Sequence, residues 1–178
     1  QKSHDVRIKK EYTGKLDFSW QITKTHDIKT GIHATLHDLD NRYHDIRNRF
    51  YGTQWENDLY EPVVLPDTSI YADVYQVKPV EFAAYIQDKM EFESMVINLG
   101  FRYEYFDPAT VYPSQRRNPA NQLDFEDPER MSTYPDVEPK IQISPRLGLA
   151  YQLGQSALLR FSYGHFRKMP PLYAMYQN

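Results

Sequence analysis

The sequence predicts an all-β chain of six long antiparallel strands in hairpins, a section of a transmembrane β-barrel with long extracellular loops. Apolar and polar residues alternate with a period of two along most of the chain, as on strands with one apolar face. The alternating segments run for roughly 10 to 13 residues, whereas globular strands have about 5–6 and tilted membrane strands about 9–11. Short and long connections also alternate, which is the loop arrangement of outer-membrane barrels.

The first hairpin is expected to join strands at about residues 15–24 and 27–38, with a tight turn near Thr25. The first strand sets aromatic and aliphatic residues against lysine, aspartate, serine, glutamine and threonine. The second strand sets Ile28, Ile32 and Leu36 against Lys29, Gly31, His33 and His37. Successive strand side chains point to opposite faces, so each strand has one apolar and one polar face.

Two further hairpins repeat this pattern. Strands are predicted at about residues 80–92 and 95–106, and again at 141–153 and 156–166. The long connections, about 39–79 and 107–140, are polar. The second connection is rich in proline, which removes a ladder donor, so long strands are not expected there. No domain boundary is visible, and residues 1–178 are interpreted as one partial barrel without a plug domain.

The composition excludes several function classes. The chain has 178 residues and no cysteine, so disulfide scaffolds, cysteine-ligated metal sites and thiol catalysis are excluded. A net charge of -3 argues against a nucleic-acid partner. No apolar run approaches the ~20 residues of a membrane helix. The chain begins at Gln1 without an apolar signal stretch, so we expect a piece of a longer or processed protein.

In a barrel, the apolar strand faces meet lipid and the polar faces line the lumen. The predicted lipid-facing residues are Leu16, Phe18, Trp20, Ile22, Ile97, Leu99, Phe101, Leu147, Leu149, Leu159 and Phe161. The predicted aromatic girdle comprises Tyr103, Tyr105 and Tyr163 toward the long loops and Tyr151 near a short turn. The predicted lumen-facing charges are Arg102, Glu104, Arg146 and Arg160.

Asp88 conflicts with this pattern, because it falls on the apolar face between Ile86 and Met90. A charged residue at the middle of a membrane is destabilising, by about 2–4 kcal/mol for Arg or Lys and less for Asp. Asp88 lies late in a strand that runs toward a short turn. We therefore expect either that Asp88 reaches the membrane interface or that a β-bulge redirects it.

The sequence contains no catalytic or phosphate-binding motif, so neither enzymatic activity nor a cofactor is expected. His33 and His37 share a strand face but lie about 13 Å apart at ~3.3 Å per residue, too far to bind one metal ion. Asp38, Asp40 and Asn41, at the start of the first long connection, have the oxygen ligands that Ca²⁺ prefers. An ordinary Asx-rich loop start is the simpler interpretation of these three residues.

Three stretches resemble a known family: KPVEFAAYIQDKMEFE at 78–93, NLGFRYEYFDP at 98–108, and 141–173 with its ISPRLG, YGHF and MPP runs. They resemble the β-barrel of TonB-dependent outer-membrane receptors. Within that family, the chain is most similar to the large receptors that carry a carboxypeptidase-regulatory-like N-terminal domain. Residues 16–39 fit the same pattern.

The resemblance implies a receptor in the outer membrane of a Gram-negative bacterium that binds a scarce nutrient and imports it with inner-membrane energy. Such receptors have a 22-stranded barrel with a plugged lumen. The implied partners are outer-membrane lipid, a nutrient that the sequence does not identify, and the plug domain and TonB, both reached through parts outside this chain. The alternative function is that of a soluble β-sandwich binding or adhesion module, whose apolar faces would pack between two sheets.

Overall fold

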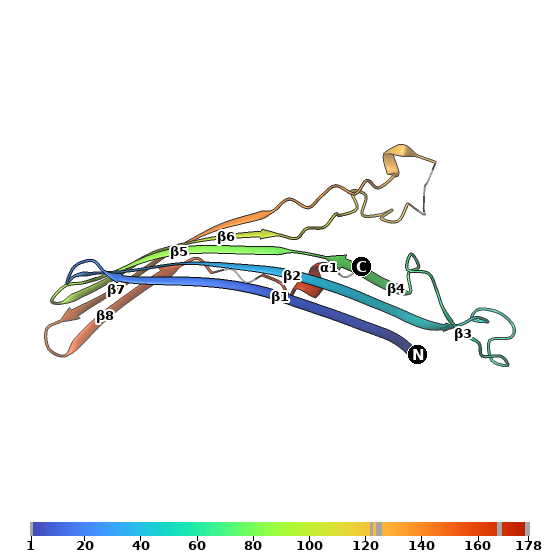
Figure 1. Ribbon diagram of the computed structural model, residues 1–178, viewed down its shortest axis with the longest axis horizontal. Helices are drawn as coiled ribbons and strands as arrows, with labels where there is room; N and C mark the ends of the chain where they lie inside the picture. The colour runs from blue at the N-terminus through green and yellow to red at the C-terminus, as the bar shows by residue number, and fades with distance from the viewer. Residues whose placement is uncertain (1, 122, 124–125, 167–168, 177–178) are drawn as a thin grey trace. The chain divides into compact units, whose positions relative to one another are not determined.

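The computed structural model describes residues 2–121, 123, 126–166 and 169–176, and its strands form one eight-stranded sheet (Figure 1). The main path is β1-β2-β5-β6-β7-β8, which follows sequence order except that β3 and β4 lie between β2 and β5 in the chain. The six strands of this path are β1 (Lys2–Gln21), β2 (His26–Asn48), β5 (Val80–Glu91), β6 (Met95–Asp107), β7 (Lys140–Leu153) and β8 (Ala157–Gly164). The antiparallel all-β fold class predicted from the sequence is confirmed.

Two short strands and two short helices complete the secondary structure that the structure describes. The short strands β3 (Pro62–Val64) and β4 (Ala72–Val77) both pair with β2. The helices are η1 (Pro128–Arg130) and α1 (Leu172–Tyr176). Among the described residues, no helix has the length and apolar character needed to cross a membrane.

The second and third hairpins match the predicted ranges to within two residues at every strand end. The first hairpin differs at its turn, because β1 ends at Gln21 and not at residue 24. The hydroxyl oxygen of Thr23 accepts the backbone N–H groups of Thr25 at 3.1 Å and His26 at 3.0 Å. These bonds close the turn earlier than the alternation of side chains suggests.

The prediction of a loop over residues 39–79 is wrong for much of its length, because β2 continues to Asn48. There β4 pairs with β2 from Leu39 opposite Val77 to His44 opposite Ala72, and β3 pairs with its last residues. β1 likewise begins at Lys2, well before residue 15. The extension of β2 carries polar side chains on both faces, so its apolar alternation stops where the backbone ladder continues. The extension of β1 still sets Val6, Ile8 and Tyr12 on one face, with Lys10 interrupting the row.

The chain divides into two compact units. One contains the described residues of 1–11, 37–78 and 169–178, and its centre is the pairing of β2 with β4. The other contains 12–36 and the described residues of 79–168, and its centre is the sheet formed by β5, β6, β7 and β8. β1 and β2 contribute residues to both units.

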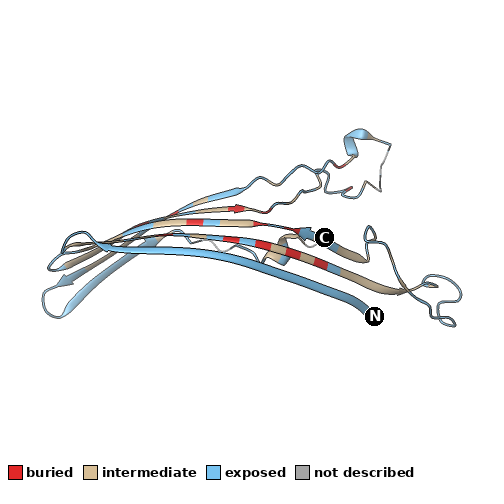
Figure 2. Cartoon of the chain, in the orientation of Figure 1, coloured by how far each residue is buried: buried red, intermediate tan, exposed pale blue. Residues whose placement is uncertain are grey.

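Very few apolar side chains of the described residues are buried (Figure 2). The buried hydrophobic residues among them are Leu39, Val77, Ala83 and Phe106, whereas Leu99 is 42%, Phe101 60% and Phe161 54% exposed. A soluble sandwich requires a second sheet that covers such residues. Among the described residues there is one sheet, so the architecture of the alternative function is not formed.

Gly154 in the β7–β8 turn has a φ of 61°, in the left-handed region. We expect Gly154→Ala to lower the free energy of unfolding by about 1–2 kcal/mol, because a Cβ is disfavoured in that region. Urea unfolding of the full-length protein in detergent measures this change. Gly14→Ala is the matched control, since no atom lies within 4 Å of the added Cβ. Equal losses in both variants would contradict the backbone explanation.

Candidate functional site: the two faces of the sheet

The predicted lipid-facing residues share one face of the sheet. Ile97 lies opposite Leu149 and Leu99 opposite Leu147, while Leu149 also lies opposite Phe161. Directly opposed residues in antiparallel strands point to the same side, so the apolar side chains form one continuous surface. On β1 the same kind of row is exposed at Leu16, Phe18 and Trp20, and Ile22 lies just beyond the strand end. Ile97, Leu147 and Leu149 are half-buried by their neighbours.

The four predicted girdle tyrosines lie on this apolar face near strand ends. Tyr103 and Tyr105 are close to the loop end of β6, where the Tyr103 ring meets the Phe82 ring edge-on at 6.5 Å. Tyr151 lies opposite Met95, beside the short turns. Tyr163 lies opposite Leu147 and is therefore in register with Leu99, not with Tyr103. Strands tilt in a barrel, so residues at the same depth in the membrane need not be paired with one another.

The opposite face carries charged side chains in short ion pairs along single strands. The atoms that pair are 2.8 Å apart in each of Lys9–Glu11, Lys15–Asp17 and Arg102–Glu104. The hydrogen bond from Lys9 lowers the pKa of Glu11, and the charges of Lys9 and His37 lower it further. Because these side chains are about a third to three fifths exposed, each pair contributes little to stability.

Gly31 allows a side chain to cross β2 on this polar face. The Tyr85 ring lies against Gly31, and its hydroxyl donates a hydrogen bond to Asp17 at 2.8 Å. A Cβ at Gly31 would lie 2.5 Å from Asp17 Oδ1, 2.6 Å from the Tyr85 ring and 2.9 Å from the Leu16 carbonyl oxygen. The glycine thus provides the space through which β5 is linked to β1.

Asp88 remains on the apolar face without a bulge, because the register runs unbroken through Asp88 opposite Ile28 and Leu99. The bulge predicted as one explanation is therefore wrong. Asp88 Oδ2 lies 2.8 Å from His26 Nδ1, and His26 follows the β1–β2 turn. Asp88 is about 10 Å from the end of β5 at ~3.3 Å per residue. The carboxylate has a partner close to the turn end of the sheet.

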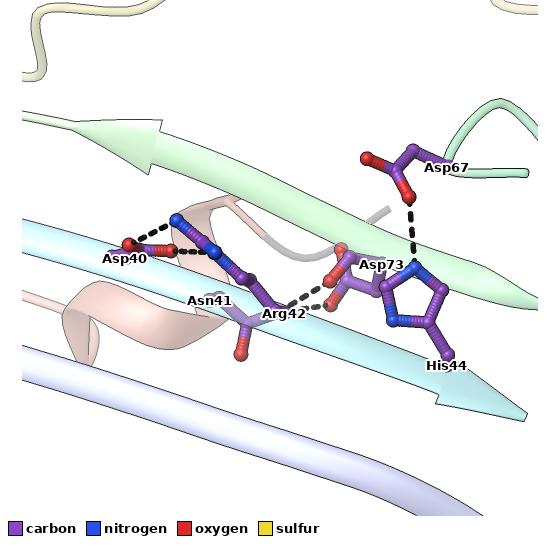
Figure 3. A network of polar contacts seen from close by, with 6 residues as sticks. All are labelled: Asp40, Asn41, Arg42, His44, Asp67 and Asp73. Atoms are coloured by element: carbon purple, nitrogen blue, oxygen red, sulfur yellow. Dashed lines mark hydrogen bonds and ion pairs between the residues drawn. The ribbon is translucent and has the colours of Figure 1, made fainter.

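At the loop end of β2, polar residues form a network on both faces of the strand (Figure 3). Arg42 donates two hydrogen bonds of 3.0 Å to the Asp40 carboxylate, and His44 Nε2 lies 2.8 Å from Asp67. Asn41, on the other face, donates to the Asp73 backbone oxygen at 2.7 Å. The candidate calcium ligands Asp40 and Asn41 thus point to opposite sides and have protein partners. They do not converge on one ion.

The first loop is attached to β2 by aromatic contacts. The guanidinium carbon of Arg47 lies 4.3 Å from the centre of the Tyr51 ring and 4.4 Å from that of Tyr71. In the same unit, a hydrogen bond to Asp45 raises the pKa of Tyr43, and burial raises the pKa of Tyr75. The Tyr75 ring also meets the Tyr176 ring of α1 at 5.8 Å.

The second long loop is organised around buried Ser132. Its Oγ lies 2.8 Å from the Asn118 carbonyl oxygen and 3.1 Å from that of Gln115. The backbone N–H of Ser132 donates to Asn121 Oδ1 at 2.6 Å, and Asn118 Nδ2 donates to the Arg130 carbonyl. Side-chain bonds to backbone groups, together with backbone bonds such as that from the Ser114 N–H to the Thr133 carbonyl, connect the two arms of this loop.

Four contacts were not predicted from the sequence: His26 with Asp88, Tyr85 with Asp17, and Arg47 with each of Tyr51 and Tyr71. Gly31, within the polar row of a strand, was the available signal for the second contact, since glycine there marks a close approach. The other contacts depend on which residues the register and the loops bring together, and the identity of a single residue does not indicate that.

The family model described as TonB dependent receptor-like, beta-barrel, matches residues 3–178. A comparison with curated proteins finds no match. The matched range contains essentially all of the strands and both long loops.

We expect Gly31→Ala to lower the free energy of unfolding by about 1–3 kcal/mol, because the methyl group overlaps a backbone oxygen that cannot move aside. Urea unfolding of the full-length protein measures the loss. Gly148→Ala is the control, since its Cβ would meet neighbours at 3.5 and 3.7 Å, which is ordinary contact. If Gly148→Ala costs as much, close approach at Gly31 is not the cause.

We expect Ser132→Ala to loosen the second loop, because the carbonyl group of buried Asn118 loses its donor, at a local cost of about 1–3 kcal/mol. Amide hydrogen exchange across residues 112–135 should rise by at least about tenfold, the equivalent of ~1.4 kcal/mol. Thr133→Val removes an exposed hydrogen bond to Ser114 and should change exchange far less. Unchanged exchange in Ser132→Ala would show that other contacts maintain the loop.

Proposed function

Because the chain belongs to the TonB-dependent receptor β-barrel family, we propose that it forms part of the wall of an outer-membrane receptor that imports a nutrient. The observation that carries the proposal is the division of the sheet into an open apolar face and a face of paired charges. No other part of the described chain covers the apolar face, and such a face is stable when membrane lipid covers it. The paired charges suit a water-filled interior.

The length of the apolar face supports a membrane span. On β6 the apolar row runs from Met95 through Phe101 to Tyr105, and Asp107 ends it. From Met95 to Asp107 the strand covers about 40 Å at ~3.3 Å per residue, or about 28 Å across a bilayer at a tilt of ~45°. This distance is close to the apolar band of about 25 Å on outer-membrane barrels.

The proposed mechanism is binding and passage without covalent chemistry. The long loops between β2 and β5 and between β6 and β7 lie outside the cell and take part in ligand capture. Arg102, Glu104, Arg146 and Arg160 line the lumen. Energy from the inner membrane arrives through a plug domain and TonB contact that lie outside this chain. We propose no enzymatic activity.

We also propose that the whole receptor belongs to the large type with a carboxypeptidase-regulatory-like N-terminal domain. The support is the similarity of the runs between residues 141 and 173 to those receptors. On the same reasoning, the residues of the apolar face contact outer-membrane lipid, and the four girdle tyrosines lie at its two interfaces.

Adjacent residues of β6 test the proposal. With a bimane fluorophore attached to Phe101→Cys in the full-length protein, we expect quenching by brominated lipid, because this side chain points to lipid. At Arg102→Cys we expect no quenching and rapid reaction with a charged, membrane-impermeant thiol reagent. The proposal fails if both positions react equally from water, or if the full-length protein stays soluble without detergent.

A further inference from the structure

Positive charges on the polar face are unevenly matched. On β5 and β6, Lys89 pairs with Glu91, and Arg102 pairs with Glu104 at 2.8 Å. On β7 and β8, Arg146 and Arg160 have no carboxylate within ion-pair distance among the described residues. These two arginines therefore give this part of the polar face a net positive charge, and their surroundings differ.

Arg146 is surrounded by glycines. It lies opposite Gly100 on β6 and Gly164 on β8, and Gly148 is the next residue of β7 on the same face. The ring of Phe166 lies over Gly164, where a Cβ would come within 2.9 Å of ring carbons. The guanidinium carbon of Arg146 is 5.3 Å from the centre of that ring. The ring thus orients the arginine, and the glycines leave the space beside it open.

A hollow of about 160 Å³ lies beside Arg146 and is lined by Tyr85, Gln87, Gly100 and Arg102 as well. Arg102 uses its Nε–H for Glu104, so its terminal NH₂ groups can still donate hydrogen bonds. The Gln87 amide is a further donor. Because Glu104 balances Arg102, the net charge of the hollow comes from Arg146. Arg160 lies opposite Ala150 and does not line the hollow.

We propose that this hollow is an anion site that binds a carboxylate group in the lumen. Arginine presents a planar fork of donors that matches a carboxylate in two parallel hydrogen bonds. The inference rests on the proposed function, since it takes the polar face to be the lumen wall. The carboxylate comes either from a solute in the lumen or from an acidic side chain of the same protein outside this chain.

The test uses the full-length protein in detergent and trifluoroacetate as the carboxylate probe. We expect the protein to broaden the ¹⁹F signal of trifluoroacetate, and Arg146→Gln to weaken that binding by about tenfold, the effect of losing one charged hydrogen-bond pair. Arg160→Gln removes the same charge from the same face without touching the hollow, and should leave the broadening within about twofold. Trifluoroethanol, which carries no charge, should show no broadening that depends on Arg146.

If the protein's own carboxylate fills the site, trifluoroacetate does not bind, and Arg146→Gln makes the remainder of the receptor more sensitive to trypsin than Arg160→Gln does. That result also supports the site and identifies its occupant. The proposal is overturned if Arg146→Gln matches Arg160→Gln in both measurements. Failure of the proposed function gives a different result, because the full-length protein would then be soluble without detergent.

Discussion

The backbone hydrogen-bond ladder is the constraint on which the rest of this structure depends. With few buried side chains, the described residues are joined mainly through the unbroken pairing of β2 with β5, β5 with β6, β6 with β7 and β7 with β8. In lipid, an unpaired N–H or C=O group costs several kcal/mol, so a membrane strand must be paired along its whole length. Continuous pairing accounts for the long strands, the tight turns and the confinement of irregular backbone to one end of each hairpin.

Because the backbone is paired in this ladder, the alternation of side chains makes one face of the sheet apolar and the other polar. One face can be fully apolar because no polar backbone group is left to satisfy there. The other face can carry close ion pairs because its partners lie two residues apart on the same strand, at the pleat repeat. Asp88 departs from the rule on the apolar face, and it does so near a turn, within reach of His26. The polar side chain of Asp88 thus lies on the apolar face without interrupting the backbone pairing.

The sequence alone predicts the strands wherever apolar and polar residues alternate, as in β5 and β6. It does not predict the end of β2, because a strand with polar residues on both faces, such as Asp40 and Asn41, has no apolar period. The start of β1 was missed because Lys10 interrupts the apolar row of Val6, Ile8 and Tyr12. Within the candidate site, the face on which each residue lies was predictable, since side chains alternate between the two faces along a strand. The contacts of Arg146 were not, because they depend on glycines contributed by two other strands.

The hydrogen-bonded frame of the second long loop, formed by Asn118, Asn121 and Ser132, has a consequence for how the sequence of this protein can evolve. Its shape depends on Asn118, Asn121 and Ser132 bonding to backbone atoms, which every residue possesses. The outward side chains of the same loop, such as Tyr112 and Leu123, are exposed and take no part in that frame. Substitutions at the outward positions can therefore accumulate while the loop keeps its shape. The outward surface of this loop can thus diversify while the hydrogen-bond ladder of β6 and β7, from which the loop extends, stays unchanged.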